Sequence, residues 1–125
     1  MPKTILIVDD STSMRQMVGF TLRTAGYQVI EGANGQEGLD CLEAAPGGKV
    51  DLIITDLNMP VMDGMVFTKA VRARPNTKFT PILVLTTEST DQRKAEGKDA
   101  GATGWIVKPF QPEGLLKVVG RVLPS

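Results

Sequence analysis

The chain of 125 residues contains no histidine and only one cysteine, Cys41. Without histidine there is no imidazole metal ligand, no Ser-His or Cys-His nucleophile and no phosphohistidine within the chain. A single cysteine excludes an intramolecular disulfide and suits a reducing compartment, and its simplest interpretation is a small helix residue. Composition therefore excludes most of the familiar enzyme classes.

The chain also lacks net charge, because 14 Lys and Arg residues balance 14 Asp and Glu residues. No long-range field favours DNA, RNA or an anionic membrane, so we expect no nucleic-acid partner. The apolar stretch nearest the N-terminus, Ile5–Val8, is far shorter than a signal-peptide core, and no segment approaches the length of a membrane span. We expect a soluble, cytoplasmic protein that is monomeric and does not insert into membranes.

What the chain does contain is an alternation of short apolar runs with segments of helical period. The runs are rich in β-branched and aliphatic residues, as strands covered on both faces require. Five strands are predicted, at Thr4–Val8, Gln28–Ile30, Val50–Thr55, Pro81–Thr86 and Trp105–Val107. The length and this alternation predict one α/β domain spanning residues 1–125.

Helices are predicted between the strands. The first has Ser11 as its N-cap, the second and third begin after Asn34-Gly35 and Asp63-Gly64, and the last has Pro112 in its first turn. The segment Thr90–Ala100 is polar almost all round, which predicts a poorly buried or mobile helix whose exposed face is available to a partner. Residues predicted to face the core are Met14, Met17, Val18, Thr21, Leu22, Ala25, Leu39, Leu42, Val66, Phe67, Ala70, Leu115, Leu116, Val119, Val122 and Leu123.

Reactive side chains follow four of the five predicted strands. An open doubly wound sheet binds its ligand beyond the carboxyl ends of its strands, where the strand order reverses. We predict a parallel sheet in the order 2-1-3-4-5, which makes the first and third strands neighbours and brings their carboxylates together. The groups at the carboxyl ends of the first, third, fourth and fifth strands are Asp9-Asp10, Asp56, Thr86-Thr87 and Lys108-Pro109.

These groups suit a phosphoryl-transfer site. Clustered carboxylates repel one another and require a cation, and oxygen ligands without histidine or cysteine suit Mg2+. In such a site Asp56 is the nucleophile towards phosphorus, while Mg2+ and Lys108 offset charge on the transferring oxygens. Taken singly, each group has an ordinary explanation as a helix cap, a strand end, a β-former or a solvated charge. Their joint position at one sheet edge favours the site.

Four motifs resemble the receiver-domain signature of response regulators in its usual order and spacing, over essentially the whole chain. They are Asp9-Asp10, the string Asp-Leu-Asn-Met-Pro-Val-Met-Asp-Gly at 56–64, Leu85-Thr86, and Lys108-Pro109-Phe110. The chain is thus identified as similar to the single-domain chemotaxis (CheY) type, which implies a flavodoxin-like, CheY-like fold.

The resemblance also implies roles for individual residues. Asp56 would be the phosphoacceptor, and Thr86 and Lys108 would bind the phosphoryl oxygens. A cis peptide is implied between Lys108 and Pro109, as X-Pro bonds permit. The implied Mg2+ ligands are Asp10 directly, Asp9 through water, Asp56, and Asn58 through its backbone carbonyl.

By the same resemblance, a histidine kinase of the chemotaxis type phosphorylates Asp56 and so changes the affinity of the protein for a target. We expect that target to be the flagellar motor switch protein. Three features favour it: the stand-alone domain, Asn58 and Glu88 beside the site, and the aromatic Trp105. A phosphatase would be a further partner. Thr86 and Trp105 would form the switch. The protein would assist its own phosphorylation and dephosphorylation without being an enzyme in the ordinary sense.

Two positions depart from the enteric CheY pattern, which has alanine and tyrosine where this chain has Thr87 and Trp105. Thr87 is bulkier and polar beside the phosphoryl site, so the rate of attack by water or a donor can differ. Trp105 has a larger ring and an indole N–H that prefers a partner, which argues against a simple inward and outward rotation.

Other functions remain as alternatives. Within the family, the chain could be a phosphorelay intermediate or a phosphate sink. Outside it, a Mg2+-dependent aspartyl-phosphate phosphatase of the haloacid-dehalogenase type would need an Asp-x-Asp motif after the first strand, which this chain lacks. Nucleotide binding is weaker still, because no G-x-G-x-x-G or P-loop motif is present.

Overall fold

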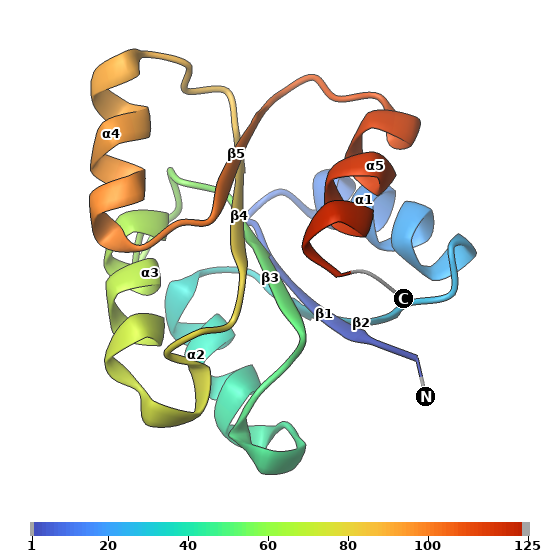
Figure 1. Ribbon diagram of the computed structural model, residues 1–125, viewed down its shortest axis with the longest axis horizontal. Helices are drawn as coiled ribbons and strands as arrows, with labels where there is room; N and C mark the ends of the chain where they lie inside the picture. Colours follow the sequence, from blue (N-terminus) through green and yellow to red (C-terminus); the bar gives the residue numbers. More distant parts are fainter. Residues whose placement is uncertain (1, 124–125) are drawn as a thin grey trace.

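A computed structural model describes residues 2–123 as a parallel sheet of five strands between two layers of helices (Figure 1). The strand order β2-β1-β3-β4-β5 confirms the prediction. The strands are β1 (Thr4–Val8), β2 (Gln28–Gly32), β3 (Leu52–Thr55), β4 (Ile82–Thr86) and β5 (Gly104–Val107). The helices are α1 (Thr12–Thr24), α2 (Gly35–Ala44), α3 (Gly64–Ala73), α4 (Asp91–Ala100) and α5 (Pro112–Val122).

The two faces of the sheet have separate cores. Helices α1 and α5 cover one face, and α2, α3 and α4 lie on the other (Figure 1). Because side chains alternate along a strand, Ile5 and Ile7 of β1 pack in the cluster with α1 and α5, whereas Leu6 and Val8 pack with α2 and α3. Apolar residues on both faces of β1 therefore account for its unbroken apolar run.

Strand and helix bounds differ from the predictions at several ends. β2 continues two residues further, to Gly32, because Glu31 and Gly32 pair with Ile7 and Val8. β3 begins two residues later than predicted and β4 one residue later. Two short 3-10 turns, Pro46–Gly48 and Pro75–Thr77, were not predicted. No helix in the described range 2–123 is long and apolar enough to cross a membrane.

Three predictions of inward-facing residues were wrong. Met17 and Val66 are 50% and 51% exposed, and Ala25, which caps the end of α1, is exposed. In α1 the core contact is narrower than the apolar pattern suggests, and in α3 Val71 is buried where Val66 is not. Only Gly97 and Ala100 of α4 are buried, which confirms that this helix is poorly covered.

Candidate functional site

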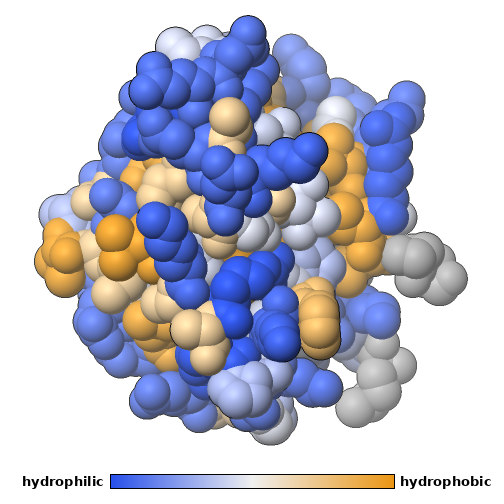
Figure 2. All heavy atoms as spheres, turned by 60° about the vertical axis from the view of Figure 1, so that its left-hand side comes forward, coloured by the Kyte–Doolittle hydropathy of each residue, from blue (hydrophilic) through white to orange (hydrophobic). Residues whose placement is uncertain are grey.

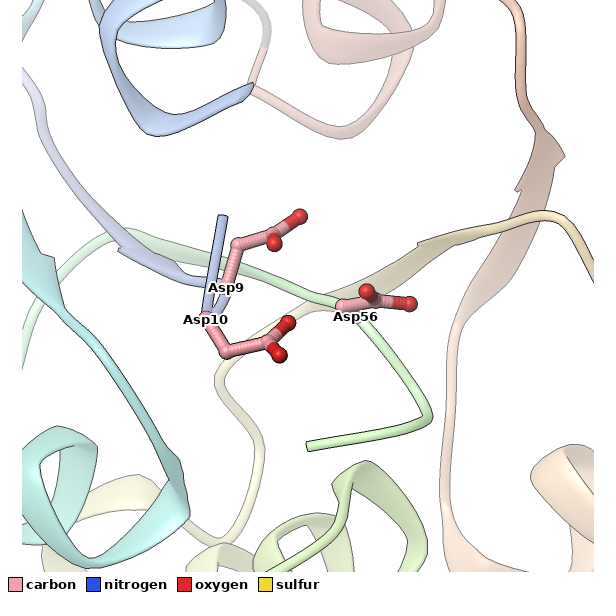
Figure 3. Close-up of side chains that lie close together, drawn as sticks. All are labelled: Asp9, Asp10 and Asp56. Atoms are coloured by element: carbon pink, nitrogen blue, oxygen red, sulfur yellow. The ribbon is translucent and has the colours of Figure 1, made fainter. Parts of the chain in front are cut away.

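Three carboxylates converge at the carboxyl end of the sheet. Asp9 and Asp10 follow β1, and Asp56 follows β3, which pairs directly with β1. One carboxylate oxygen from each residue lies within 4.8 Å of the others. Figure 3 shows the three carboxylates extending to the same side of the strand ends. The pairing of β1 with β3 thus produces the acidic cluster that the sequence predicts.

Lys108 joins two of these carboxylates. Its Nζ donates to Asp9 Oδ2 at 3.0 Å and to Asp56 Oδ2 at 3.2 Å. The other oxygens accept backbone N–H groups, Asp9 Oδ1 from Ser11 at 2.9 Å and Asp56 Oδ1 from Leu57 at 2.7 Å. The peptide bond between Lys108 and Pro109 is cis, as the resemblance implied. In both Asp9 and Asp56, each of the two carboxylate oxygens therefore accepts a hydrogen bond, which fixes the orientation of the side chain.

Burial affects the two charged partners of this ion pair differently. Asp9 is buried, and desolvation raises its pKa above the ordinary value despite the hydrogen bonds from Ser11 and Lys108, which lower it. Burial alone would lower the pKa of Lys108, but the hydrogen bonds and charges of Asp9 and Asp56 outweigh it and raise that pKa. Lys108 therefore stays charged at neutral pH, and its single ammonium pairs with two of the three clustered carboxylates.

The cluster fits Mg2+. Its donors are all oxygens, and the chain has no histidine to direct the site towards a softer metal. Asp10 is exposed, so one carboxylate faces solvent while Asp9 lies deeper. A bound cation would offset the repulsion among the carboxylates and the desolvation of Asp9.

We expect Mg2+ to stabilise the fold, because a ligand that binds only the folded state shifts the unfolding equilibrium. At a concentration near 100 times the dissociation constant, the gain is about 2.7 kcal/mol. Protonation competes with the metal, and since the folded protein has a raised Asp9 pKa, the gain should shrink as the pH falls through that pKa. Thermal melts with Mg2+ and with chelator over a pH series measure this. An equal gain at every pH would contradict it.

The loop after β4 connects the site to β5. Thr86 is fully buried, and its hydroxyl oxygen accepts the Glu88 N–H at 3.4 Å, whereas Thr87 is exposed. The Glu88 side chain accepts from Asn58 Nδ2 at 3.4 Å, and its carbonyl accepts the Trp105 indole N–H at 2.8 Å. Glu88 therefore contacts the loop after Asp56, the predicted switch threonine and the predicted switch tryptophan.

Arg15 belongs to the site although the sequence analysis did not single it out. Its Nη1 donates to the Asp9 carbonyl at 2.5 Å, and its Nε lies 3.5 Å from Glu31 Oε1. Glu31 also pairs with Arg23 at 3.2 Å. Arg15 therefore ties the backbone at Asp9 to the end of β2. An arginine within the first two turns after an acidic pair is a signal that could have indicated this contact.

Comparison with known proteins assigns the family. Residues 5–120 match the family described as Response regulator receiver domain. The chain belongs to this family. Chemotaxis protein CheY1 of Helicobacter pylori strain J99 is 40% identical to this receiver domain over 120 residues, 95% of each chain. The solved structure of the chemotaxis response regulator CheY4 of Vibrio cholerae is 54% identical, covers 98% of this chain and 100% of that one, and has a TM-score of 0.92.

The family identifies the chain as a two-component response regulator, a signalling protein and not a classical enzyme, and the two relatives named above are chemotaxis proteins. Receiver domains bind Mg2+ in an acidic pocket, and Asp9, Asp10 and Asp56 form such a cluster here. The receiver domain of sensor histidine kinase PA1611 from Pseudomonas aeruginosa was solved with a magnesium ion in its active-site cleft. It is 28% identical, with a TM-score of 0.89 and full coverage of both chains.

Proposed function

We propose that this response regulator is phosphorylated on Asp56 by a histidine kinase of the chemotaxis type and thereby changes its affinity for the flagellar motor switch protein. The observation that carries this proposal is the Asp56 carboxylate, which is held 3.2 Å from Lys108 Nζ beside two further carboxylates. The likeness to chemotaxis proteins over nearly the whole chain supports the target class. A cytoplasmic location and a monomeric state are part of the proposal.

Phosphoryl transfer requires little acid–base chemistry from the chain. A carboxylate oxygen of Asp56 attacks the phosphorus of a phosphohistidine, the P–N bond breaks, and the donor imidazole leaves with the bonding electrons. The Leu57 N–H orients the carboxylate, and Lys108 offsets charge on the transferring oxygens. Mg2+, held by Asp9, Asp10, Asp56 and the Asn58 carbonyl, would supply further charge neutralisation. The same groups would assist attack by water on the acyl phosphate.

Thr86 and Trp105 are proposed to read the phosphoryl group. A phosphoryl oxygen gives the Thr86 hydroxyl a new acceptor, and this biases the loop that Glu88 links to the indole. Such a local event can favour one of two arrangements of the loop and its neighbouring helix.

Thr86→Ala should therefore take up the phosphoryl group yet lose its response to it. Allosteric coupling is typically 5-fold to 150-fold in affinity, and we expect the ratio of phosphorylated to free affinity to fall to about 1. Binding of the switch-protein peptide, measured with and without beryllofluoride as phosphoryl mimic, provides the ratio. Thr87→Ala, at the exposed neighbouring position, should retain the response. An undiminished ratio in Thr86→Ala would remove the hydroxyl from the mechanism.

The function itself is tested with two partners. A motor-type regulator should bind a flagellar switch-protein peptide through α4, β5 and α5, more tightly with the phosphoryl mimic. A phosphorelay intermediate or phosphate sink would instead exchange its phosphoryl group rapidly with a histidine phosphotransfer domain and show no peptide preference. Titration of the peptide and the time course of label transfer, measured on the same preparation, distinguish these outcomes.

A further inference from the structure

Helix α4 has almost no apolar side chain of its own to hold it against the sheet. Its buried residues are Gly97 and Ala100, and the remainder of the helix is polar or charged apart from exposed Ala95. Figure 2 shows hydrophilic side chains over the upper part of this face, where α4 lies. The apolar contact that holds α4 in place must therefore come from neighbouring elements.

Trp105 of β5 provides that contact. A Cβ built at Gly97 would lie 2.5 Å from Trp105 Cζ3 and 3.1 Å from Cε3, so the six-membered ring lies against the bare backbone of α4. Met65 of α3 also approaches this position, with its Cε 3.7 Å from the same Cβ. Glycine is less favourable than alanine inside a helix, yet α4 has glycine at the position where a side chain would collide with the indole.

The two ends of α4 are held in different ways. At its C-terminal end, Arg72 of α3 donates from Nε and Nη2 to the Gly101 carbonyl at 3.1 and 2.9 Å. Before its N-terminal end, the Trp105 indole N–H holds the Glu88 carbonyl at 2.8 Å. The C-terminal end is thus attached to α3, and the loop that leads into the N-terminal end is attached to the indole.

We propose that Gly97 is a positioning residue that lets the Trp105 indole pack against the last turn of α4, so that the indole links this turn to the loop at Glu88 that precedes the helix. The loop at Glu88 and this part of α4 then move together with the ring. The use of this contact in signalling rests on the proposed function, because a shift at Thr86 would reach α4 through Glu88 and the seated indole. The packing itself does not depend on phosphorylation.

Gly97→Ala tests this packing contact in the unphosphorylated protein. Trp105 is the only tryptophan, so tryptophan emission reports on this ring alone. The rigid indole cannot yield to a methyl group as a flexible side chain would, so it should leave its site. We expect red-shifted emission, stronger acrylamide quenching, and amide exchange at least about tenfold faster in residues 94–100, the part of α4 whose N–H groups donate within the helix. The matched control is Gly120→Ala in α5, where an added Cβ meets nothing within 4 Å.

Two further variants keep the test decisive. Gly97→Ala combined with Trp105→Phe should regain α4 protection relative to Gly97→Ala alone, because a smaller ring leaves room for the methyl group. If Gly97→Ala does not fold cooperatively, Trp105→Ala decides: faster exchange confined to α4 supports the proposal, and unchanged α4 exchange overturns it. Emission, quenching and exchange in folded Gly97→Ala equal to those of Gly120→Ala would also overturn it. A failure of Asp56 to accept phosphoryl groups would leave all these results intact.

Discussion

Asp56→Asn should reduce phosphoryl uptake from acetyl phosphate by more than about 100-fold, because an amide lacks the anionic oxygen that attacks phosphorus. The replacement is nearly isosteric, and its amide oxygen can still accept the Leu57 N–H, so the fold should persist. Intact-protein mass spectrometry should show one added phosphoryl group on the unmodified chain and none on the variant. Labelling of the unmodified chain should also require Mg2+, since the carboxylate cluster repels an anionic donor without it.

Asp40→Asn is the matched control for this experiment. Asp40 is exposed on α2, where its carboxylate accepts a hydrogen bond from Gln36, and it does not belong to the acidic cluster of Asp9, Asp10 and Asp56. The control should label at the rate of the unmodified chain. Equal labelling of Asp56→Asn, or labelling that continues in excess chelator, would show that the nucleophile or the metal is wrongly assigned.

Gly64→Ala should destabilise the protein and disturb the site together. Gly64 begins α3, and its N–H donates to the Leu57 carbonyl at 2.8 Å. An added Cβ would overlap the Asp56 carbonyl oxygen and lie 2.9 Å from Leu57 Cα. Both neighbours are backbone atoms in the loop that carries the proposed phosphoacceptor, so relief requires that loop to move. We expect a loss of about 3 kcal/mol in unfolding free energy.

This loss corresponds to a fall in melting temperature of about 10 °C for a domain of this size. Phosphoryl uptake by the folded fraction should also slow, because Asp56 would be displaced from Lys108. Gly114→Ala in α5 is the control, since a Cβ there meets nothing within 4 Å. A melting temperature for Gly64→Ala equal to that of Gly114→Ala would show that the loop accommodates the methyl group without cost.

The local apolar pattern predicts which residues are buried in β1 but not in every helix. Ile5–Val8 are all buried because helices cover both sides of β1, and an unbroken apolar run predicts this directly. Met17 and Val66 are also apolar and at helical spacing, yet each is about half exposed. Periodicity reports which residues could share a helix face, but the width of the face that is covered depends on the neighbouring elements.

The sequence by itself determined the α/β alternation, the five strands and the groups that follow them, because strand and helix periods and chain breaks are local properties. It also placed Asp9, Asp10 and Asp56 at one edge, since parallel strands deliver their carboxyl ends to the same side of a sheet. Only the tertiary structure decided that Asp9 is buried while Asp10 is exposed, that Lys108 bonds both Asp9 and Asp56, and that Arg15 holds the Asp9 backbone. The same holds for Trp105 against Gly97. These contacts join residues from different strands and helices, so they depend on distances that the packing of the whole domain sets.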